Sequence, residues 1–266
     1  MRRGSRFGFV GASVAFALSV FAADASATAV DMGPPDAPLP TPPGPGLDAT
    51  WASLQDPSMF KLLDVAMTLL SAPGTVAMNG VGPIAFSNFL LPLGDSPTQS
   101  AMPFSPQGDP LGGGEYIVTS MKGFWAARAA GVYTIAAGSD DGYRVTMKGT
   151  RLLDYPHPQS FARAAKTISV PEPGLYAFEV DYFNGIQEGA FELWVTTGEV
   201  AITAPTQHVP AGFTLVPQAD LYPVSASSGG TLDAGTPATD GGSGSDAGSS
   251  VDSGSNGVDA GHGSSD

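Results

Sequence analysis

The sequence predicts an all-β domain, an antiparallel β-sandwich or barrel-like fold with one early helix, flanked by a Pro-rich segment and a Gly/Ser/Asp-rich segment. Apolar and polar residues alternate along three stretches: "GYRVTM" (142–147), "LYAFEVDYF" (175–183) and "AFELWV" (190–195). Alternation with a period of two residues gives a strand one apolar and one polar face. Gly, Pro, Asn and Asp separate these stretches, which is typical of antiparallel strands that share one buried face.

The first residues of the chain are typical of an export signal. Three arginines precede an apolar stretch, residues 7–23, and Ala25 and Ala27 then fit an A-x-A cleavage site. We expect residues 1–29 to be a signal peptide that is removed after Ala27 or Ala29. A membrane anchor is the alternative, but the apolar stretch is short and rich in Gly, Ala and Ser for a spanning helix. The protein is therefore expected to be secreted or in the cell envelope, without membrane insertion after cleavage.

Two segments have compositions that disfavour a packed core. Residues 30–46 are dense in proline, which favours an extended, semi-rigid linker. Residues 224–266 contain no aromatic residue, lysine or arginine and are rich in Gly, Ser and Asp. Such a segment cannot bury enough apolar surface to offset its ordering entropy, so we expect a disordered acidic tail. The domain itself is expected at residues 47–223.

Charge and cysteine content exclude several functions. The formal net charge of −14 repels nucleic acid and anionic lipid surfaces and attracts cations, so nucleic-acid binding is not expected. The chain has no cysteine, which excludes disulfides, thiolate metal sites and a cysteine nucleophile. Stability must come from an ordinary core or from bound ions.

One helix is predicted ahead of the strands. Asp56 and Pro57 suit the N-cap and the first helical position, and apolar residues then recur near the helical period until Pro73 and Gly74 end the pattern. Residues 75–114 are dense in Gly and Pro, which predicts a loop with one or two short strands, one of them around "PIAFSNF".

The most informative polar feature is the pair Asp140–Asp141 in "SDDG". Two adjacent like charges are costly unless water or a cation neutralises them. One interpretation is a solvated turn, in which aspartate bonds nearby N–H groups and Gly142 supplies a permissive dihedral angle. The other is half of a Ca²⁺ site, because Ca²⁺ takes about six to eight hard oxygen ligands. The residues alone leave both open.

The stretches "GFWAARAAGVYTIAAGSDDGYRVTMKGTRLLDY" and "ISVPEPGLYAFEVDYFNGIQEGAFELWV" together resemble the protective-antigen fourteen-kilodalton domain family. These β-sandwich modules occur in anthrax protective antigen, yeast flocculin adhesins and some glycosidases. The resemblance is strong over residues 123–195 and weak before them. The long insertion of residues 52–114 could cover or reshape the ligand face.

The resemblance implies a ligand set. In the sugar-binding members, two consecutive aspartates joined by a cis peptide bind Ca²⁺, a late loop supplies further oxygens, and sugar hydroxyls complete the shell. For this chain it implies metal binding by Asp140, Asp141 and Asn184, with Gln187 and Glu188 as further loop oxygens. Trp194, on the predicted less buried face of its strand, is a candidate for stacking against a sugar.

The sequence thus predicts a secreted, non-catalytic, adhesin-like module that binds a glycan with Ca²⁺ as cofactor. The first alternative is a structural spacer or protein-interaction β-sandwich with neither metal nor sugar. A less favoured alternative is an accessory domain of a glycan hydrolase. Hydrolysis needs two carboxylates about 5 to 9.5 Å apart across a bound sugar, which Asp154 with Asp181 or Glu188 could provide in principle.

Overall fold

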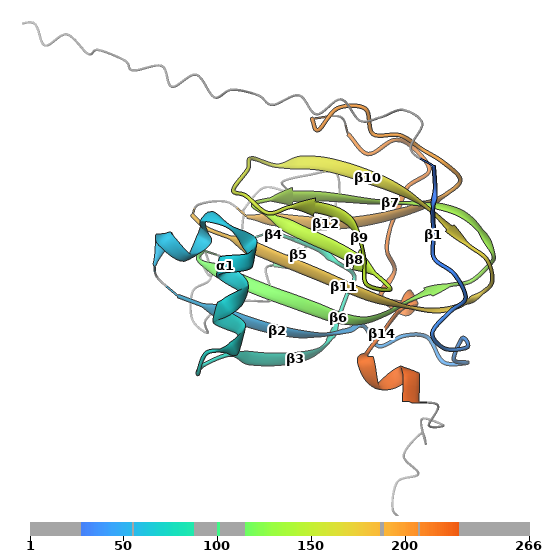
Figure 1. Ribbon diagram of the computed structural model, residues 1–266, viewed down its shortest axis with the longest axis horizontal. Coiled ribbons are helices and arrows are strands. Elements are labelled where there is room, and N and C mark those ends of the chain that lie inside the picture. Colours follow the sequence, from blue (N-terminus) through green and yellow to red (C-terminus); the bar gives the residue numbers. More distant parts are fainter. Residues whose placement is uncertain are drawn as a thin grey trace, which may run out of the picture. The chain divides into compact units, whose positions relative to one another are not determined.

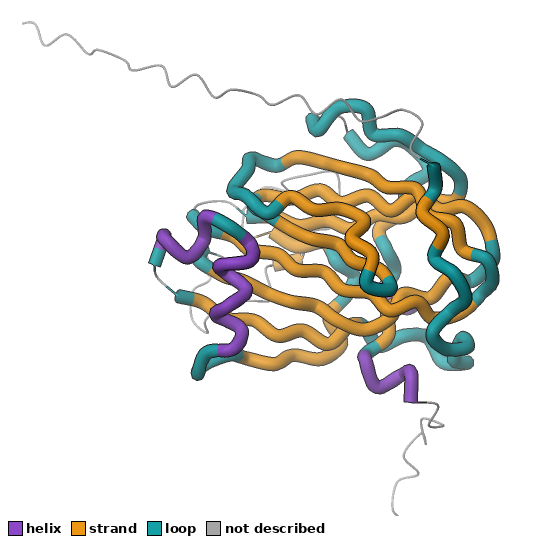
Figure 2. The backbone as a smooth tube through the Cα atoms, in the orientation of Figure 1, coloured by secondary structure: helices purple, strands orange, loops and turns teal. Residues whose placement is uncertain are grey.

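Two β-sheets face each other in the computed structural model of the protein (Figures 1 and 2). The structure describes residues 28–54, 56–87, 100–101, 115–186, 189–206 and 208–228. Apolar side chains from both sheets fill the space between them, including Trp125, Tyr133 and Phe191. The predicted all-β sandwich is therefore confirmed.

Each sheet is named here after a strand near its centre. The β7 sheet contains, in order across the sheet, β1 (Val30–Asp31), β10 (Ala162–Val170), β7 (Gly131–Asp140), β12 (Ala190–Thr197), β4 (Ala85–Ser87) and β5 (Ser100–Ala101), with β13 (Thr214–Leu215) also paired with β12. The β11 sheet contains β3 (Val76–Val81), β2 (Leu47–Ser53), β6 (Ile117–Ala127), β11 (Gly174–Asn184), β8 (Tyr143–Met147) and β9 (Thr150–Tyr155), with β14 (Leu221–Tyr222) paired with β6. Pairing is antiparallel except for β1 with β10 and β4 with β5.

The alternation of apolar and polar residues in the sequence only partly corresponds to a buried and an exposed face of each strand. Strand β8 alternates between buried and half-buried residues, as expected. The first five residues of β12 are all buried, so the prediction of a less buried face for Trp194 is wrong. Trp194 and Ala136 lie on the outer face of the β7 sheet, where Ile202 and Phe213 from the following loop cover them. Alternation in sequence cannot reveal a loop that covers the polar face.

The early helical segment begins and ends where predicted but is broken in the middle. It consists of η1 (Pro57–Lys61), α1 (Leu63–Met67) and η2 (Thr68–Ser71), and Asp56 accepts a hydrogen bond from Ser58 N at 3.0 Å. Leu62 has an extended backbone with φ −145°, and Leu63 N donates to the carbonyl of Pro156. Phe60, Leu63 and Ala66 are buried against Ala52, Val118 and Phe183 of the β11 sheet. The segment thus covers the outer face of one end of that sheet (Figure 1).

The Pro-rich segment is part of the domain rather than a separate linker, which corrects the boundary expected at residue 47. Val30 pairs with Ile168, Asp36 Oδ2 accepts from Ala177 N, and Tyr222 Oη donates to the carbonyl of Pro42. Val30 and Asp31 form a short parallel pairing with β10. Prolines lack an N–H group but keep a carbonyl acceptor, so the rest of the segment can dock on the domain through carbonyl and side-chain hydrogen bonds.

The C-terminal boundary also differs slightly from the expected one. The residues after β14 form a short helix, η4 (Val224–Ser228), and Ala226 packs beside Tyr222. A further 3₁₀ turn, η3 (Gln218–Asp220), precedes β14. The signal peptide expected at 1–29 lies almost wholly, and the acidic tail mostly, outside the described residues. Within the described part of the chain, no helix has the length and apolar character needed to cross a membrane.

Candidate functional site

Three crossovers between the two sheets meet at one end of the sandwich. Asp141 and Gly142 carry the chain from β7 to β8, residues 156–161 carry it from β9 to β10, and residues 185–189 lie between β11 and β12. Ala190 pairs with Asp140, and Phe183 N donates to Gly142 O at 3.0 Å. The aspartate pair therefore lies where the sandwich changes sheets, and it is not the turn of a hairpin.

Asp141 is held by backbone groups of the two other crossovers. Its side chain is buried, with 8% of the residue exposed, and Oδ1 accepts from Gln159 N at 3.0 Å while Oδ2 accepts from Gly185 N at 2.8 Å. Burial raises the pKa of Asp141 above its ordinary value, although the two backbone N–H groups act in the opposite direction. Among the described residues, no lysine, arginine or histidine forms an ion pair with this carboxylate.

The backbone around the pair is also fixed by side chains. The Asp140–Asp141 peptide bond is cis. Tyr182 Oη donates to Asp140 O at 2.8 Å, and Ser139 Oγ donates to Asp141 O at 2.7 Å. Tyr182 is fully buried, and burial together with the nearby aspartates raises the pKa of its phenol well above the ordinary value. The hydroxyl therefore stays a hydrogen-bond donor.

The glycine after the pair is required by close packing. A Cβ on Gly142 would lie 2.3 Å from Phe183 Cε1 and 2.9 Å from the carbonyl oxygens of Tyr155 and His157. Any larger residue would push the crossover away from β11 and disturb the position of Asp141.

Asn184 lies close to the pair through the start of β12. It is fully buried, and a Cβ on Gly189 would lie 2.4 Å from its Nδ2 atom, directly before the residue that pairs with Asp140. Its Oδ1 atom is buried and accepts no hydrogen bond, although other atoms of the residue do interact. Asn184 therefore lies near the aspartate pair in the fold, and its amide oxygen is a ligand of the hard type that Ca²⁺ binds.

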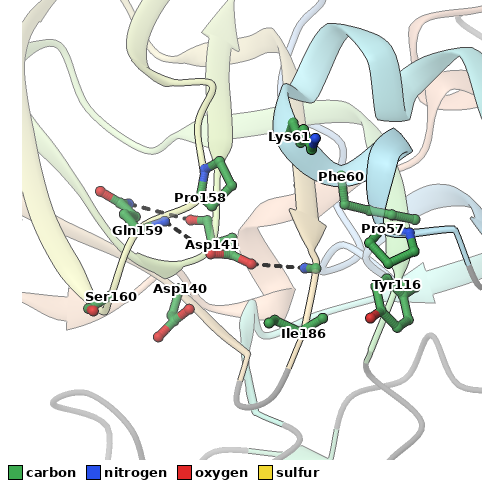
Figure 3. A pocket seen from close by; sticks show the side chains of 11 residues that line it. Pro57, Phe60, Lys61, Tyr116, Asp140, Asp141, Pro158, Gln159, Ser160 and Ile186 are labelled. Atoms are coloured by element: carbon green, nitrogen blue, oxygen red, sulfur yellow. Dashed lines mark hydrogen bonds between the residues drawn. The ribbon is translucent and has the colours of Figure 1, made fainter. Parts of the chain in front are cut away.

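A pocket of about 410 Å³ opens at this junction (Figure 3). One side is polar and carries Asp140, Asp141, Gln159 and Ser160. The other side is apolar and carries Pro57, Phe60, Tyr116 and Ile186, with Lys61 next to it. Pro57, Phe60 and Lys61 belong to the described part of the insertion of residues 52–114, and they form one wall of the pocket.

The structure brings together some of the predicted residues and separates others. Asp140 and Asp141 line the pocket, and Asn184 lies beside it. Gln187 and Glu188 fall outside the described residues. Trp194 is not in the pocket lining, because it lies in the covered cluster on the outer face of the β7 sheet and donates from Nε1 to Glu192 Oε2 at 3.3 Å.

The other acidic candidates also lie away from the pocket. Asp154 accepts from Arg144 at 3.2 Å and from Arg151 at 2.7 Å. Asp181 is buried and accepts from Ser120 Oγ at 2.7 Å. Asp154 and Asp181 lie on either side of Arg144 on adjacent strands, so they do not face each other across a cavity.

The donor chemistry near the pair suits Ca²⁺. Two carboxylates and one amide oxygen are hard ligands, and Ca²⁺ accepts such groups together with backbone carbonyls and water. In the described parts of the chain, no group of three or more His, Cys, Asp or Glu side chains gathers at one point, so a thiolate or histidine site is not formed there. By chemical type these side chains suit a calcium ion, which would need further oxygens to complete its coordination shell.

Sequence reasoning missed the wall residues Phe60, Lys61 and Tyr116, and also Gln159. Phe60 and Lys61 lie in the predicted helix, whose apolar pattern indicated only core packing. Tyr116 directly precedes β6 and has a positive φ of 51°, which is uncommon for a non-glycine residue. No local pattern marks these residues, because they reach the pocket through the tertiary fold.

The fold and site together define a β-sandwich with a pocket at its sheet crossovers. Neither a family model nor a curated protein matches the chain. Solved structures do match it at low identity. The PA14 domain of the MpAFP antifreeze protein is 14% identical, with a TM-score of 0.48, and the match covers 70% of this chain and 94% of that domain.

Two further structures illustrate the range of similar proteins. The epithelial adhesin 9 A domain from Candida glabrata, in complex with Galb1-4GlcNAc, is 13% identical with a TM-score of 0.43, and the match covers 68% of this chain and 95% of that one. An anti-sigma factor domain-containing protein is 16% identical with a TM-score of 0.44. That match covers 67% of this chain but only 48% of the other, so this chain spans about half of its length.

Proposed function

We propose that this protein is an exported, non-catalytic, adhesin-like module that binds carbohydrate at the crossover pocket with Ca²⁺ held by Asp140, Asp141 and Asn184. One observation carries the proposal. The carboxylate of Asp141 is buried beside a second carboxylate at the edge of a pocket, and no described cationic side chain pairs with it.

The charge balance supports a cation at this place. Removing a carboxylate from water is costly unless an opposite charge compensates it. The two N–H groups that bond Asp141 are neutral, so they orient the carboxylate without cancelling its charge. A divalent cation would cancel the charges of Asp140 and Asp141 together. When bound, Ca²⁺ would supply coordination positions for neighbouring hydroxyl groups of a sugar.

The remaining residues suit a sugar ring. Pyranose rings have an apolar face, and the pocket offers an apolar side opposite polar groups. Tyr116 is half-buried, and its backbone N–H donates to Gly185 O at 2.7 Å, so it is tied to the same crossover as Asp141. Such preorganisation reduces the entropy cost of binding. Single shallow sites bind weakly, so we expect multivalent display to increase avidity.

Calcium titration of the full chain tests the proposal. The protein is treated with a chelator, dialysed, and titrated with CaCl₂ in a calorimeter, and a glycan array is then probed with and without chelator. Asp140→Asn and Asp141→Asn should abolish Ca²⁺ binding and chelator-sensitive glycan binding.

Asp181→Asn is the matched control, because Asp181 is also buried but lies outside the pocket lining. It should bind Ca²⁺ and glycans as the unchanged protein does. Absence of heat with the unchanged protein at millimolar Ca²⁺ would overturn the proposal and favour a structural spacer.

A further inference from the structure

Among the described residues that line the crossover pocket, Lys61 is the one basic residue. Most basic side chains of the described chain have an acidic partner within ion-pair distance: Lys122, Arg128, Arg144, Lys148 and Arg151. Lys61 forms no ion pair with any described residue and is exposed. Asp56 is near enough for a weak electrostatic interaction with Lys61 but forms no ion pair with it, so the ammonium group at the mouth of the pocket is available to a ligand.

The neighbours of Lys61 hold its backbone at the pocket. Asp56 and Pro57 start the helical turn η1, and Phe60 is 3% exposed. The ring of Phe60 lies 5.6 Å from that of Tyr116 and 6.4 Å from that of Phe183. Because Phe60 is anchored in this way, the next residue is held at the rim, next to the aromatic wall.

The charges of the site then favour an anion. A calcium ion would offset the charges of Asp140 and Asp141, and Lys61 would then present a positive charge at the rim of the pocket. The chain as a whole carries −14, so this charge is opposite in sign to that of the protein as a whole. A neutral sugar would leave the charge of Lys61 unused, whereas a charged group beside the ring could reach it.

We propose that the pocket selects an acidic sugar, whose ring packs against Tyr116 and whose anionic group, a carboxylate or a sulfate ester, pairs with Lys61. This inference rests on the proposed function, since it assumes a sugar at the calcium site. A charge-assisted contact at a partly exposed rim is worth a severalfold change in affinity and weakens with salt.

Binding of paired sugars to the full chain tests the assignment. Trigalacturonate is compared with its methyl ester, and a sulfated galactan oligosaccharide with its unsulfated form. All measurements use one Ca²⁺ concentration, so that the binding of Ca²⁺ by the sugar itself is the same for every protein variant. The unchanged protein should bind at least one acidic sugar about threefold to tenfold more tightly than its neutral counterpart. The pair that shows the preference identifies the anionic group.

Lys61→Met should remove this preference, so that the affinities for the acidic sugar and for its neutral counterpart become about equal. Lys61→Arg should retain the preference because the charge remains. Lys122→Met is the matched control: Lys122 is exposed on β6 and does not line the pocket, so the preference should persist. Raising NaCl should weaken the preference of the unchanged protein.

The outcomes separate the two proposals. Equal affinity for acidic and neutral sugars, or a preference that survives in Lys61→Met, would overturn the role of Lys61 and leave the calcium-dependent site in place. A protein that binds neither Ca²⁺ nor any of the four sugars would overturn both. Thermal unfolding of each variant shows whether a loss of binding reflects a loss of folding.

Discussion

Two buried aspartates in this domain have similar burial but opposite surroundings. Asp141 is 8% exposed and Asp181 is 4% exposed, and burial is the main cause that raises the pKa of both. Asp181 accepts from Ser120 and lies near the cations of Lys122 and Arg144, which lower its pKa in part. Asp141 has only neutral backbone donors and a neighbouring negative charge.

The difference distinguishes a structural carboxylate from one that suits ligand binding. Asp181 and Arg144 are paired across adjacent strands on the outer face of the β11 sheet, and Arg144 also contacts Asp154 and Asp64. The counter-charge of Asp181 is therefore part of the fold. The counter-charge of Asp141 is absent among the described residues, and a pocket lies where it could enter.

Removing the cation beside Asp181 should have the largest effect. Arg144→Met removes the guanidinium that lies between Asp181 and Asp154, and the side chain of Arg144 is only 13% exposed. Loss of one partner from a largely buried charge group costs about 3 to 4 kcal/mol. We expect that loss of unfolding free energy at pH 8 and a much smaller one near pH 4, where Asp181 is protonated. Urea unfolding at both pH values measures it, and an equal loss at both would contradict the electrostatic cause.

The pH dependence of the unchanged protein gives the next effect. Burial raises the pKa of Asp181 to about 6 in the folded state, from 3.8 ordinarily. The folded state therefore binds this proton more tightly than the unfolded state. The resulting stabilisation is fully present below about pH 4 and is lost as the pH rises through about 6, and it amounts to roughly 3 kcal/mol.

Asp181→Asn isolates that contribution because its amide can still accept from Ser120 Oγ without carrying a charge. The difference in unfolding free energy between the variant and the unchanged protein should grow in favour of the variant between pH 4 and pH 7. A difference that stays constant over this range would show that Asp181 titrates normally.

Calcium should then distinguish the two aspartates directly. At a free Ca²⁺ concentration about 100 times the dissociation constant, binding to the folded state alone adds about 2.7 kcal/mol of stability. We expect this gain in the unchanged protein and in Asp181→Asn, and none in Asp141→Asn. Thermal unfolding with and without Ca²⁺ measures it. A gain in Asp141→Asn equal to that of the unchanged protein would place any calcium ion elsewhere.

Sequence patterns predicted the strands well because alternation and turn residues act locally. The strands around Tyr143, Val180 and Phe191 were found in this way, as was the N-cap at Asp56. The break at Leu62 was not predicted, because a contact with a distant loop at Pro156 stabilises it.

The environment of polar residues could not be predicted by the same means. Asp181 and Glu192 alternate with apolar residues along their strands, and this pattern predicts that their side chains are exposed. Both are instead buried. The helical segment lies over the outer face of the β11 sheet, and the loop after β12 covers that of the β7 sheet. Lys61 and Tyr116 reach the pocket through the same kind of long-range packing. The aspartate pair could be found because its two charges are adjacent in sequence.

The smallest effect is expected for the exposed end of the charge group around Arg144. Asp64 on α1 lies 2.9 Å from Arg144, but its side chain is 74% exposed, so water screens the interaction. Asp64→Asn should therefore lower the unfolding free energy by less than about 1 kcal/mol, and the effect should shrink further in high salt. Urea unfolding at low and high NaCl measures it.

A loss for Asp64→Asn as large as that for Arg144→Met would mean that the ion pair, rather than apolar burial, attaches the helical segment to the sheet. The packing argues against this, because Leu63 and Ala66 on the same short helix are fully buried against the β11 sheet. Burial of a leucine side chain contributes about 1.5 to 3 kcal/mol, which exceeds a screened ion pair. The helical segment, and with it the wall that carries Lys61, should therefore stay in place in Asp64→Asn, so sugar selectivity in that variant should equal that of the unchanged protein.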